Sequence, residues 1–314
     1  MRIVIAGGSG FLGSALSRQL SADGHDVVVL TRRATPATAG KSDGSAKAVR
    51  EQVWVPNGTT GEWARALDAA DAVVNLAGES IAARRWTAAQ KEKIRTSRLL
   101  ATRSLVAAIR GASSKPRVFL SASAVGYYGD RGDETLTEAS AAGHDFLATL
   151  CQEWEAAAGE AATVTRVGLL RTGIVLDRQG GALPKMLPPF LLFAGGPIGS
   201  GRQYMPWIHK QDWVRLAAWM LQHDAARGPL NATAPNPVRN AEFSKALGHT
   251  LRRPSMLPAP GFALKAILGE MADALLLSGQ RALPVRACDL GFSFRFSNVD
   301  EALADIFNRG DTNR

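Results

Sequence analysis

The chain has 314 residues, of which 46% are hydrophobic and 21% are charged, and its formal net charge is +9. This composition excludes a disordered or fibrous protein and indicates a globular chain of one large domain or two smaller ones. The 2 cysteines lie far apart, which excludes a disulfide framework and a cysteine metal site, and no apolar run approaches the roughly 20 residues of a membrane span. We therefore expect a cytoplasmic protein with no resident metal and no membrane partner.

The basic charge does not point to nucleic acid. Lys and Arg are spread along the chain, and no aromatic-rich RNA-binding motif accompanies them. An anionic cofactor and a solvated basic surface explain the charge, so we expect no nucleic-acid partner. Met1 and Arg2 run directly into an apolar segment, which leads us to expect no signal peptide.

The first thirty residues carry the clearest pattern. The apolar run Ile3–Ala6 is typical of a strand buried on both faces, and a glycine-rich turn occupies residues 7–13. A helical pattern continues to Leu20, and Asp26–Leu30 reads as a second buried strand. The order of strand, glycine turn, helix and strand predicts one half of a dinucleotide-binding unit.

The spacing of the glycines fits a pyrophosphate. Gly7 allows a sharp turn, Gly10 lets the backbone approach the phosphates, and Gly13 lets the helix pack closely on the sheet. The N-terminus of the helix offers N–H groups and a partial positive charge to an anion. The residues expected to hold the pyrophosphate are Gly7, Gly10, Phe11, Leu12 and Gly13. The alternative is a glycine turn with a purely structural role.

The end of the second strand indicates which dinucleotide binds. NAD sites usually have a carboxylate there to hold the ribose 2′-hydroxyl, whereas this chain has Thr31, Arg32 and Arg33. Two guanidinium groups suit a 2′-phosphate, because they form charge-assisted hydrogen bonds with it. The sequence therefore predicts NADP(H) as the cofactor, with an ordinary basic loop as the alternative.

The chain then continues as an α/β alternation. Residues 34–50 lack periodicity and are expected to form a surface loop or an insertion. A third strand is expected at 52–55, a short helix at 62–67, a buried strand from 72 with its turn at 77–78, and a long helix at 86–110. Further strands are expected at 117–123 and 164–170, with a helix at 146–158 between them.

Ligands bind at the carboxyl ends of the strands in open α/β sheets. Residues expected at that edge to contact the cofactor are Leu76, Ala77, Gly78, Glu79, Arg98, Ser121 and Arg171. Ser123 also follows a buried strand and could bond a substrate oxygen, and Tyr127 lies on the loop after it. Each has a structural alternative: a solvated arginine, a serine that satisfies a turn, a packed aromatic ring.

The regular alternation decays after residue 172. Glycines and prolines break the region into short pieces, with helices expected at 210–223, 240–248 and 261–277 and a strand at 229–233. We predict an α/β protein with a Rossmann-type, doubly wound parallel sheet and a smaller C-terminal substrate domain. The Rossmann domain should span 1–172, with 225–240 returning to it, and the substrate side 173–314.

Several longer motifs carry a resemblance to a known family. They are Asn75–Ile81, Arg85–Thr87, Ser97–Arg98, Asp145–Leu147, Cys151, Trp154–Glu155, Gly195–Gly201, Pro206–His209, and Leu251–Pro254 through Phe292. With the glycine turn and the strand ending at Ser123, the chain resembles the atypical extended short-chain dehydrogenases/reductases of the NAD-dependent epimerase/dehydratase superfamily. More narrowly, it is similar to the SDR39U1-type epimerase family proteins. The resemblance implies a family-specific C-terminal segment at about 250–302.

The catalytic pair of that superfamily is missing. Typical relatives use Tyr-x-x-x-Lys, in which the tyrosine exchanges a proton and the lysine assists it. Where the pair should lie, the chain has Phe146 and Leu150, and Arg98 stands where an asparagine is expected. Ser123 keeps its place, and Tyr127 is the favoured replacement acid or base.

Four other residues are candidates for that role by position. Tyr128 and Glu79 are candidates by position, whereas Cys151 on an apolar helix face fits the core better. His209 should fix the loop before its helix, through Asp212 or a backbone carbonyl.

The sequence therefore favours an NADP(H)-binding oxidoreductase or epimerase-like protein that acts on an unidentified small molecule. We expect it to be a monomer or a homodimer. The alternative is a non-catalytic NADP(H)-binding regulatory or interaction module, which the loss of the Tyr-x-x-x-Lys pair supports.

Overall fold

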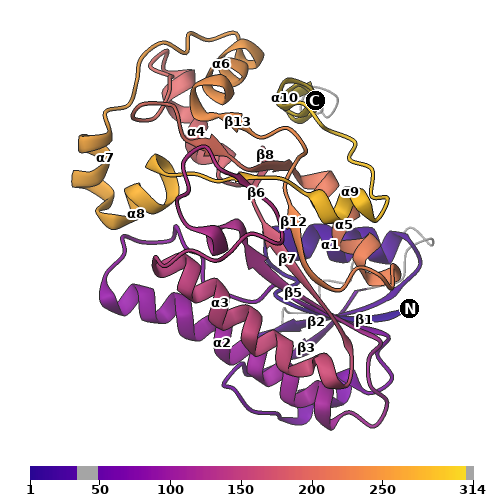
Figure 1. Cartoon of the computed structure of the whole chain (residues 1–314). Helices are drawn as coiled ribbons and strands as arrows, with labels where there is room; N and C mark the ends of the chain where they lie inside the picture. The colour runs from indigo at the N-terminus through magenta and orange to yellow at the C-terminus, as the bar shows by residue number, and fades with distance from the viewer. Residues whose placement is uncertain (34–48, 309–314) are drawn as a thin grey trace.

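A seven-stranded parallel sheet forms the centre of the computed structural model, which describes residues 1–33 and 49–308 (Figure 1). The strand order is β12-β7-β5-β4-β1-β2-β3, so the chain winds outward in both directions from β1 and β4. The strands are β1 (Arg2–Ala6), β2 (Asp26–Thr31), β3 (Arg50–Val53), β4 (Ala72–Asn75), β5 (Val118–Ala124), β7 (Arg166–Thr172) and β12 (Gly228–Ala232). The predicted Rossmann-type doubly wound sheet is confirmed.

Both faces of the sheet are apolar, which is why its strands read as continuous hydrophobic runs. Ile3 and Ile5 face one layer, formed by helices α1 (Phe11–Ala22) and α5 (Lys210–Gln222). Val4 faces the opposite layer, whose main helix is α2 (Ala88–Gly111). Helix α3 (Phe146–Gly159) lies beside α2 (Figure 1). Within the described residues no helix is long and apolar enough to cross a membrane.

The elements of the first half lie close to their expected ranges. The short helix at 62–67 is a 3-10 helix, η1 (Glu62–Leu67), and the loop after β5 contains a second one, η2 (Val125–Tyr128). The third strand begins at Arg50, two residues before the expected start. Most of the predicted loop at 34–50 lies outside the described residues, since these resume at Val49.

Shorter elements follow in the second half and lie beyond the carboxyl ends of the main strands (Figure 1). The small strands are β6 (Thr135–Leu136), β8 (Ile174–Asp177), β9 (Gly180–Gly181), β10 (Tyr204–Met205), β11 (Trp207–His209), β13 (Val238–Arg239) and β14 (Arg281–Ala282). The helices are α4 (Leu183–Leu191), α6 (Asn240–Leu251), α9 (Val285–Asp289) and α10 (Val299–Asn308). The 3-10 helix η3 (Glu160–Thr163) lies elsewhere, between α3 and the start of β7. A separate core around Trp207, Phe243 and Leu303 holds this region together.

The single helical stretch expected at 261–277 is wrong. The chain forms α7 (Gly261–Leu268), then α8 (Glu270–Ala272), and then one π-helical turn, η4 (Asp273–Leu277). The break falls at Gly269, which has a φ of 63°. A glycine adopts this left-handed angle without steric cost, but the angle is incompatible with a continuous α-helix. Helix α4 was also missed, because its two internal prolines read as breakers although the helix passes through them.

The chain returns to the main sheet after residue 172. Strand β12 pairs with β7 in parallel, and α5 packs into the same core layer as α1. Residues 173–314 therefore contribute to both regions, and the division into two domains stays a prediction.

A buried carboxylate ties the C-terminal segment to α5. Asp212 is fully buried, and its two oxygens accept hydrogen bonds from the backbone N–H groups of Arg295 (3.0 Å) and Phe296 (2.8 Å). The Arg215 guanidinium donates to the same carboxylate at 2.7 Å. Because the Phe296 N–H is buried away from water, the carboxylate that accepts its hydrogen bond stabilises the docking of the segment that leads into the last helix.

Asp212→Asn should lower the free energy of unfolding by about 2–3 kcal/mol, because the asparagine N–H₂ would face a buried N–H donor. Urea denaturation followed by circular dichroism measures this. The control is Asp224→Asn, since the Asp224 side chain is 97% exposed and lies 3.8 Å from Arg166. Equal stability of the two variants would contradict the proposed tie.

Candidate functional site

The glycine turn between β1 and α1 is shaped by two close approaches. Gly7 has a φ of 80°, and its O accepts a hydrogen bond from the Gly10 N–H at 3.0 Å. A Cβ on Gly7 would lie 2.6 Å from the Leu76 carbonyl, and a Cβ on Gly13 would lie 2.2 Å from the Gly7 oxygen. A Cβ on Gly10 would meet only the Gly7 oxygen, at 3.2 Å. Close packing therefore requires a glycine at positions 7 and 13. The outer side of Gly10, in contrast, faces no protein group other than Gly7.

The N-terminus of α1 is suited to an anion. Its N-cap is Gly10, which supplies no side-chain cap, and the first turn contains no acidic residue. The Phe11 ring packs against β9, where a Cβ on Gly180 would lie 2.3 Å from it. Leu12 packs against the core. Phe11 and Leu12 can therefore serve a phosphate through their backbone N–H groups and not through their side chains.

A cleft of about 610 Å³ lies next to this turn and is lined by Ser9, Thr31, Arg32 and Arg33. The Thr31 hydroxyl donates to the Arg33 carbonyl at 2.8 Å and so shapes the loop that carries both arginines. The fold thus brings a residue of the glycine turn and the predicted 2′-phosphate residues to one cleft. Both the charge and the open side of Gly10 fit an NADP(H) molecule.

The segment Leu76–Glu79 follows β4 and is held from below. The Asn75 side chain accepts from the Ala77 N–H at 3.2 Å, and the Glu79 N–H donates to Ser97 Oγ at 2.9 Å. Arg98 donates to the Glu79 carbonyl at 2.9 Å and lies 3.1 Å from the place of a Cβ on Gly78. Burial lowers the pKa of Arg98. Arg98 therefore supports this segment, and the roles of Asn75 and Ser97 were not expected.

Ser121 does not reach the crevice surface. It is fully buried, with its hydroxyl 3.4 Å from the Asn75 amide nitrogen and 3.4 Å from the Ala122 carbonyl. From this position under the edge of the sheet, the Ser121 hydroxyl helps to orient the Asn75 side chain.

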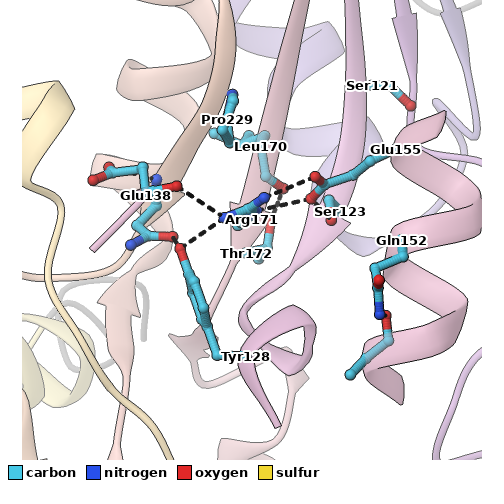
Figure 2. Close-up of polar contacts among 12 residues, drawn as sticks. Ser121, Ser123, Tyr128, Glu138, Gln152, Glu155, Leu170, Arg171, Thr172 and Pro229 are labelled. Carbon is cyan, nitrogen blue, oxygen red and sulfur yellow. Dashed lines mark hydrogen bonds and ion pairs between the residues drawn. The ribbon is translucent and has the colours of Figure 1, made fainter. Parts of the chain in front are cut away.

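A buried ion pair lies at the ends of β5 and β7 (Figure 2). Arg171 donates from Nε and Nη2 to the two carboxylate oxygens of Glu155, at 2.8 and 2.9 Å. Ser123 donates its hydroxyl proton to the same carboxylate at 2.6 Å. Arg171 and Ser123 are each 3% exposed. Burial would lower the pKa of Arg171, but the bonds and charge of Glu155 outweigh it and raise that pKa.

The two tyrosines after β5 take different positions. Tyr128 is fully buried, accepts from Arg171 Nη1 at 3.0 Å and donates to Asn231 Oδ1 at 2.7 Å. Burial raises the pKa of Tyr128 to about 12. Tyr127 is half-buried, and its ring centroid lies 3.5 Å from the guanidinium carbon of Arg171. Of the two phenols, Tyr127 is thus the one that partly faces outward beside the buried cation.

The positions of the missing catalytic pair form an apolar contact. Phe146 meets Trp86 edge-to-face at 5.2 Å, and both pack in one cluster with Leu150 and with Met271 from α8. Burial raises the pKa of Cys151 to about 11, which suits a core residue and not a nucleophile. Within the described residues, no group of three His, Cys, Asp or Glu side chains lies together as a metal site would need.

His209 has a different partner from the one expected. Its Nδ1 accepts from the Gln211 N–H at 3.1 Å and caps α5, while its Nε2 lies 3.4 Å from the Asp305 carboxylate of α10. Asp212, one of the two partners expected for it, bonds Arg295 and Phe296 instead.

A second pocket, of about 370 Å³, lies beside the loop that follows Tyr127. Arg202 and Arg239 line it together with Asp130 and Asp133, and Arg239 contacts Asp133 at 3.0 Å. The hydrogen bond from Arg239 and the charges of Arg202 and Arg281 lower the pKa of Asp133. The pocket is therefore polar, with two arginines and two aspartates in its lining, and among the described residues Arg202 forms no ion pair with either aspartate.

Two family models match the chain. One describes the NAD dependent epimerase/dehydratase family and matches residues 3–232, and the other a domain of unknown function (DUF1731) at 259–306. "Epimerase family protein ML0860" of Mycobacterium leprae is 44% identical over 99% of this chain and 97% of its own length.

Two solved structures are similar to this chain. The human epimerase family protein SDR39U1, crystallised with NADPH, has a TM-score of 0.87 and 35% identity over 98% of this chain and 99% of that one. The nucleoside-diphosphate sugar epimerase from Corynebacterium glutamicum has a TM-score of 0.75 and 34% identity, over 97% of this chain and 57% of that one.

The burial of Cys151 predicts a pH dependence of stability. Its pKa of about 11 in the fold lies above the ordinary value of 9.0, so the native state favours the protonated thiol. The contribution is present below pH 9 and is lost as the pH rises to about 11, by roughly 2–3 kcal/mol. Cys151→Ala should flatten this loss in urea titrations across that range. Cys288→Ala, at an exposed cysteine, should keep most of it; equal slopes in all three proteins would contradict the prediction.

Proposed function

The chain belongs to the NAD dependent epimerase/dehydratase family, in its SDR39U1-type branch, and on that premise we propose that it is an NADP(H)-dependent oxidoreductase or epimerase-like enzyme. The observation that carries the proposal is the cleft in which the open glycine turn meets Arg32 and Arg33. The similar human protein, whose structure contains NADPH, supports the same cofactor.

Each part of the site would bind a different portion of the cofactor. The N–H groups at the start of α1 would bind the pyrophosphate, and Arg32 and Arg33 would bind the 2′-phosphate. Leu76–Glu79, held by Arg98 and Ser97, would line the nucleoside and ribose. Bound NADP(H) would supply or accept a hydride, and the protein would supply orientation and proton exchange.

The substrate side is assigned from charge and chain distance. Asp130 of the arginine-lined pocket follows Tyr127 by three residues, so their Cα atoms lie within about 11 Å. A small molecule whose anionic group binds Arg202 and Arg239 could therefore place its reacting carbon near Tyr127. The nucleoside-diphosphate sugar epimerase among the similar structures acts on such an anionic molecule, which supports this class of substrate.

Tyr127 is the proposed acid or base. Arg171, fixed by Glu155, packs a permanent cation against its ring. Ser123 would not donate its proton to a substrate, because its hydroxyl donates to the Glu155 carboxylate. It would act indirectly, through that carboxylate.

A non-catalytic NADP(H)-binding module is the second candidate. The observation that favours it is the inward hydroxyl of Ser123, together with the apolar contact at Phe146 and Leu150. In this case cofactor binding would set a conformation that a partner reads. Binding of a partner only in the presence of NADPH, without turnover of any carbonyl compound, would favour the module.

Arg32→Ala/Arg33→Ala should weaken NADPH binding by at least about a hundredfold, because two charge-assisted hydrogen bonds to the 2′-phosphate are lost. NADH binding should change by less than about threefold, since NADH has no 2′-phosphate. Calorimetric titration of both cofactors into protein stripped of nucleotide measures this.

The matched control for this titration is Arg103→Ala/Arg110→Ala, at two exposed arginines on α2. Its affinity for NADPH should equal that of the unmodified protein. Equal weakening of NADPH and NADH in the Arg32/Arg33 variant would refute the 2′-phosphate assignment.

Tyr127→Phe should lower the turnover rate of any substrate found by about a hundredfold or more, because general acid–base groups contribute on that scale. Its affinity for NADPH should not change, since the phenylalanine ring keeps the contact with Arg171. A screen of carbonyl compounds followed by NADPH absorbance provides the assay. Unchanged turnover in the variant would remove Tyr127 as the acid.

A further inference from the structure

Large apolar side chains are exposed along two segments of the C-terminal region. Leu192 is 77% exposed, Met256 82%, Phe262 79% and Ile267 69%. Leu191, Phe193 and Leu257 are also exposed and lie in the same two segments. Helix α7, which carries Phe262 and Ile267, has no buried residue. Exposed apolar residues in such number mark a contact surface.

The two segments lie side by side. The Leu257 N–H donates to the Gly195 carbonyl at 3.1 Å, and the Ala259 N–H donates to the Pro197 carbonyl at 2.8 Å. The Arg253 guanidinium lies 4.6 Å from the centre of the Phe193 ring. The apolar residues at the end of α4 and before α7 therefore form one surface, which we call the α4–α7 surface. Figure 1 shows α4, α6 and α7 at the end of the molecule opposite β3.

The backbone holds one aromatic ring outward. Phe193 has a φ of 60°, a left-handed conformation that aromatic residues rarely adopt, and its side chain is 58% exposed. This conformation caps the C-terminus of α4, because the Phe193 N–H donates to the Phe190 carbonyl at 3.0 Å and the Ala194 N–H donates to the Pro189 carbonyl at 2.8 Å. The cap places the Phe193 ring on the outside of the molecule and not in the core.

The chain segments that form the α4–α7 surface are predominantly basic. The sequence contains no Asp or Glu between Asp177 and Asp212 and none between Glu242 and Glu270. The same stretches contain Arg178, Lys185, Arg202, Lys210, Lys245, Arg252, Arg253 and Lys265, of which Lys210 is paired with Asp177. The acidic residues that flank α7 are already paired, Glu270 with Lys91 and Asp273 with Lys265.

We propose that the α4–α7 surface docks on an anionic lipid membrane, with Leu192, Phe193 and Met256 inserted among the headgroups. Apolar side chains next to an excess of Lys and Arg are the combination that binds such a surface, because apolar burial and attraction to acidic headgroups act together. The contact is peripheral and needs no spanning helix, so a hydropathy scan gives no signal for it. It revises the sequence-based expectation of no membrane partner.

The test is sedimentation of the full chain with vesicles of phosphatidylcholine, with and without phosphatidylglycerol. The protein should sediment with the anionic vesicles alone, and added salt should release it. Arg252→Gln/Arg253→Gln should weaken partitioning by about 25-fold, since each basic residue strengthens it about fivefold. Leu192→Ser/Met256→Ser should weaken it by about tenfold or more. If that variant fails to fold, Phe262→Ser/Ile267→Ser on α7 takes its place.

Matched controls separate this surface from the net charge of the whole protein. Val53→Ser/Val55→Ser removes exposed apolar groups near β3, and Arg103→Gln/Arg110→Gln removes two charges on α2. Both controls should partition like the unmodified protein. No sedimentation with anionic vesicles, or an equal loss in the controls, would overturn the proposal. So would a dimer by light scattering that the Leu192/Met256 variant dissociates, because the surface would then be covered by a second copy.

Discussion

The buried Arg171 guanidinium is the constraint on which the crevice depends. A cation removed from water destabilises the fold unless an anion and further acceptors surround it, and here Glu155 and the Tyr128 hydroxyl do so. The same carboxylate fixes Ser123, and the same cation carries the Tyr127 ring. The geometry of the candidate site is therefore a consequence of satisfying one charge between β5, β7 and α3.

That constraint extends into the C-terminal segment. Tyr128 bonds Asn231, whose amide donates to the Leu283 carbonyl, and the buried Glu138 accepts from the N–H groups of Asn231 and Arg286. Removing residues near 283–286 would leave several of these groups without partners in the interior. The region matched as a domain of unknown function is thus part of the support of the crevice, and not an appendage to it.

How much the sequence could predict follows from how local each interaction is. The turn from Gly7 to Gly13 is determined by neighbours within a few residues, so its spacing predicts both the fold and the cleft. The pair Glu155 and Arg171 joins a helix to a strand, and the tie from Asp212 to Phe296 spans 84 residues. A single sequence carries no pattern for such pairs. The break at Gly269 was readable in principle, but apolar residues on both sides concealed it.

The absence of the Tyr-x-x-x-Lys pair also has a physical explanation in the packing around Phe146 and Leu150. Phe146 and Leu150 pack with Trp86 and with Met271 of α8, so an ammonium in place of the buried Leu150 would lie in an apolar cluster. The contact between Met271 of α8 and these α3 residues therefore fits the loss of the pair. The polar groups Ser123, Glu155 and Arg171 lie instead at the ends of β5 and β7, where the Glu155 carboxylate compensates the charge of Arg171. The Tyr127 ring lies beside these groups, with its centroid 3.5 Å from the guanidinium carbon of Arg171.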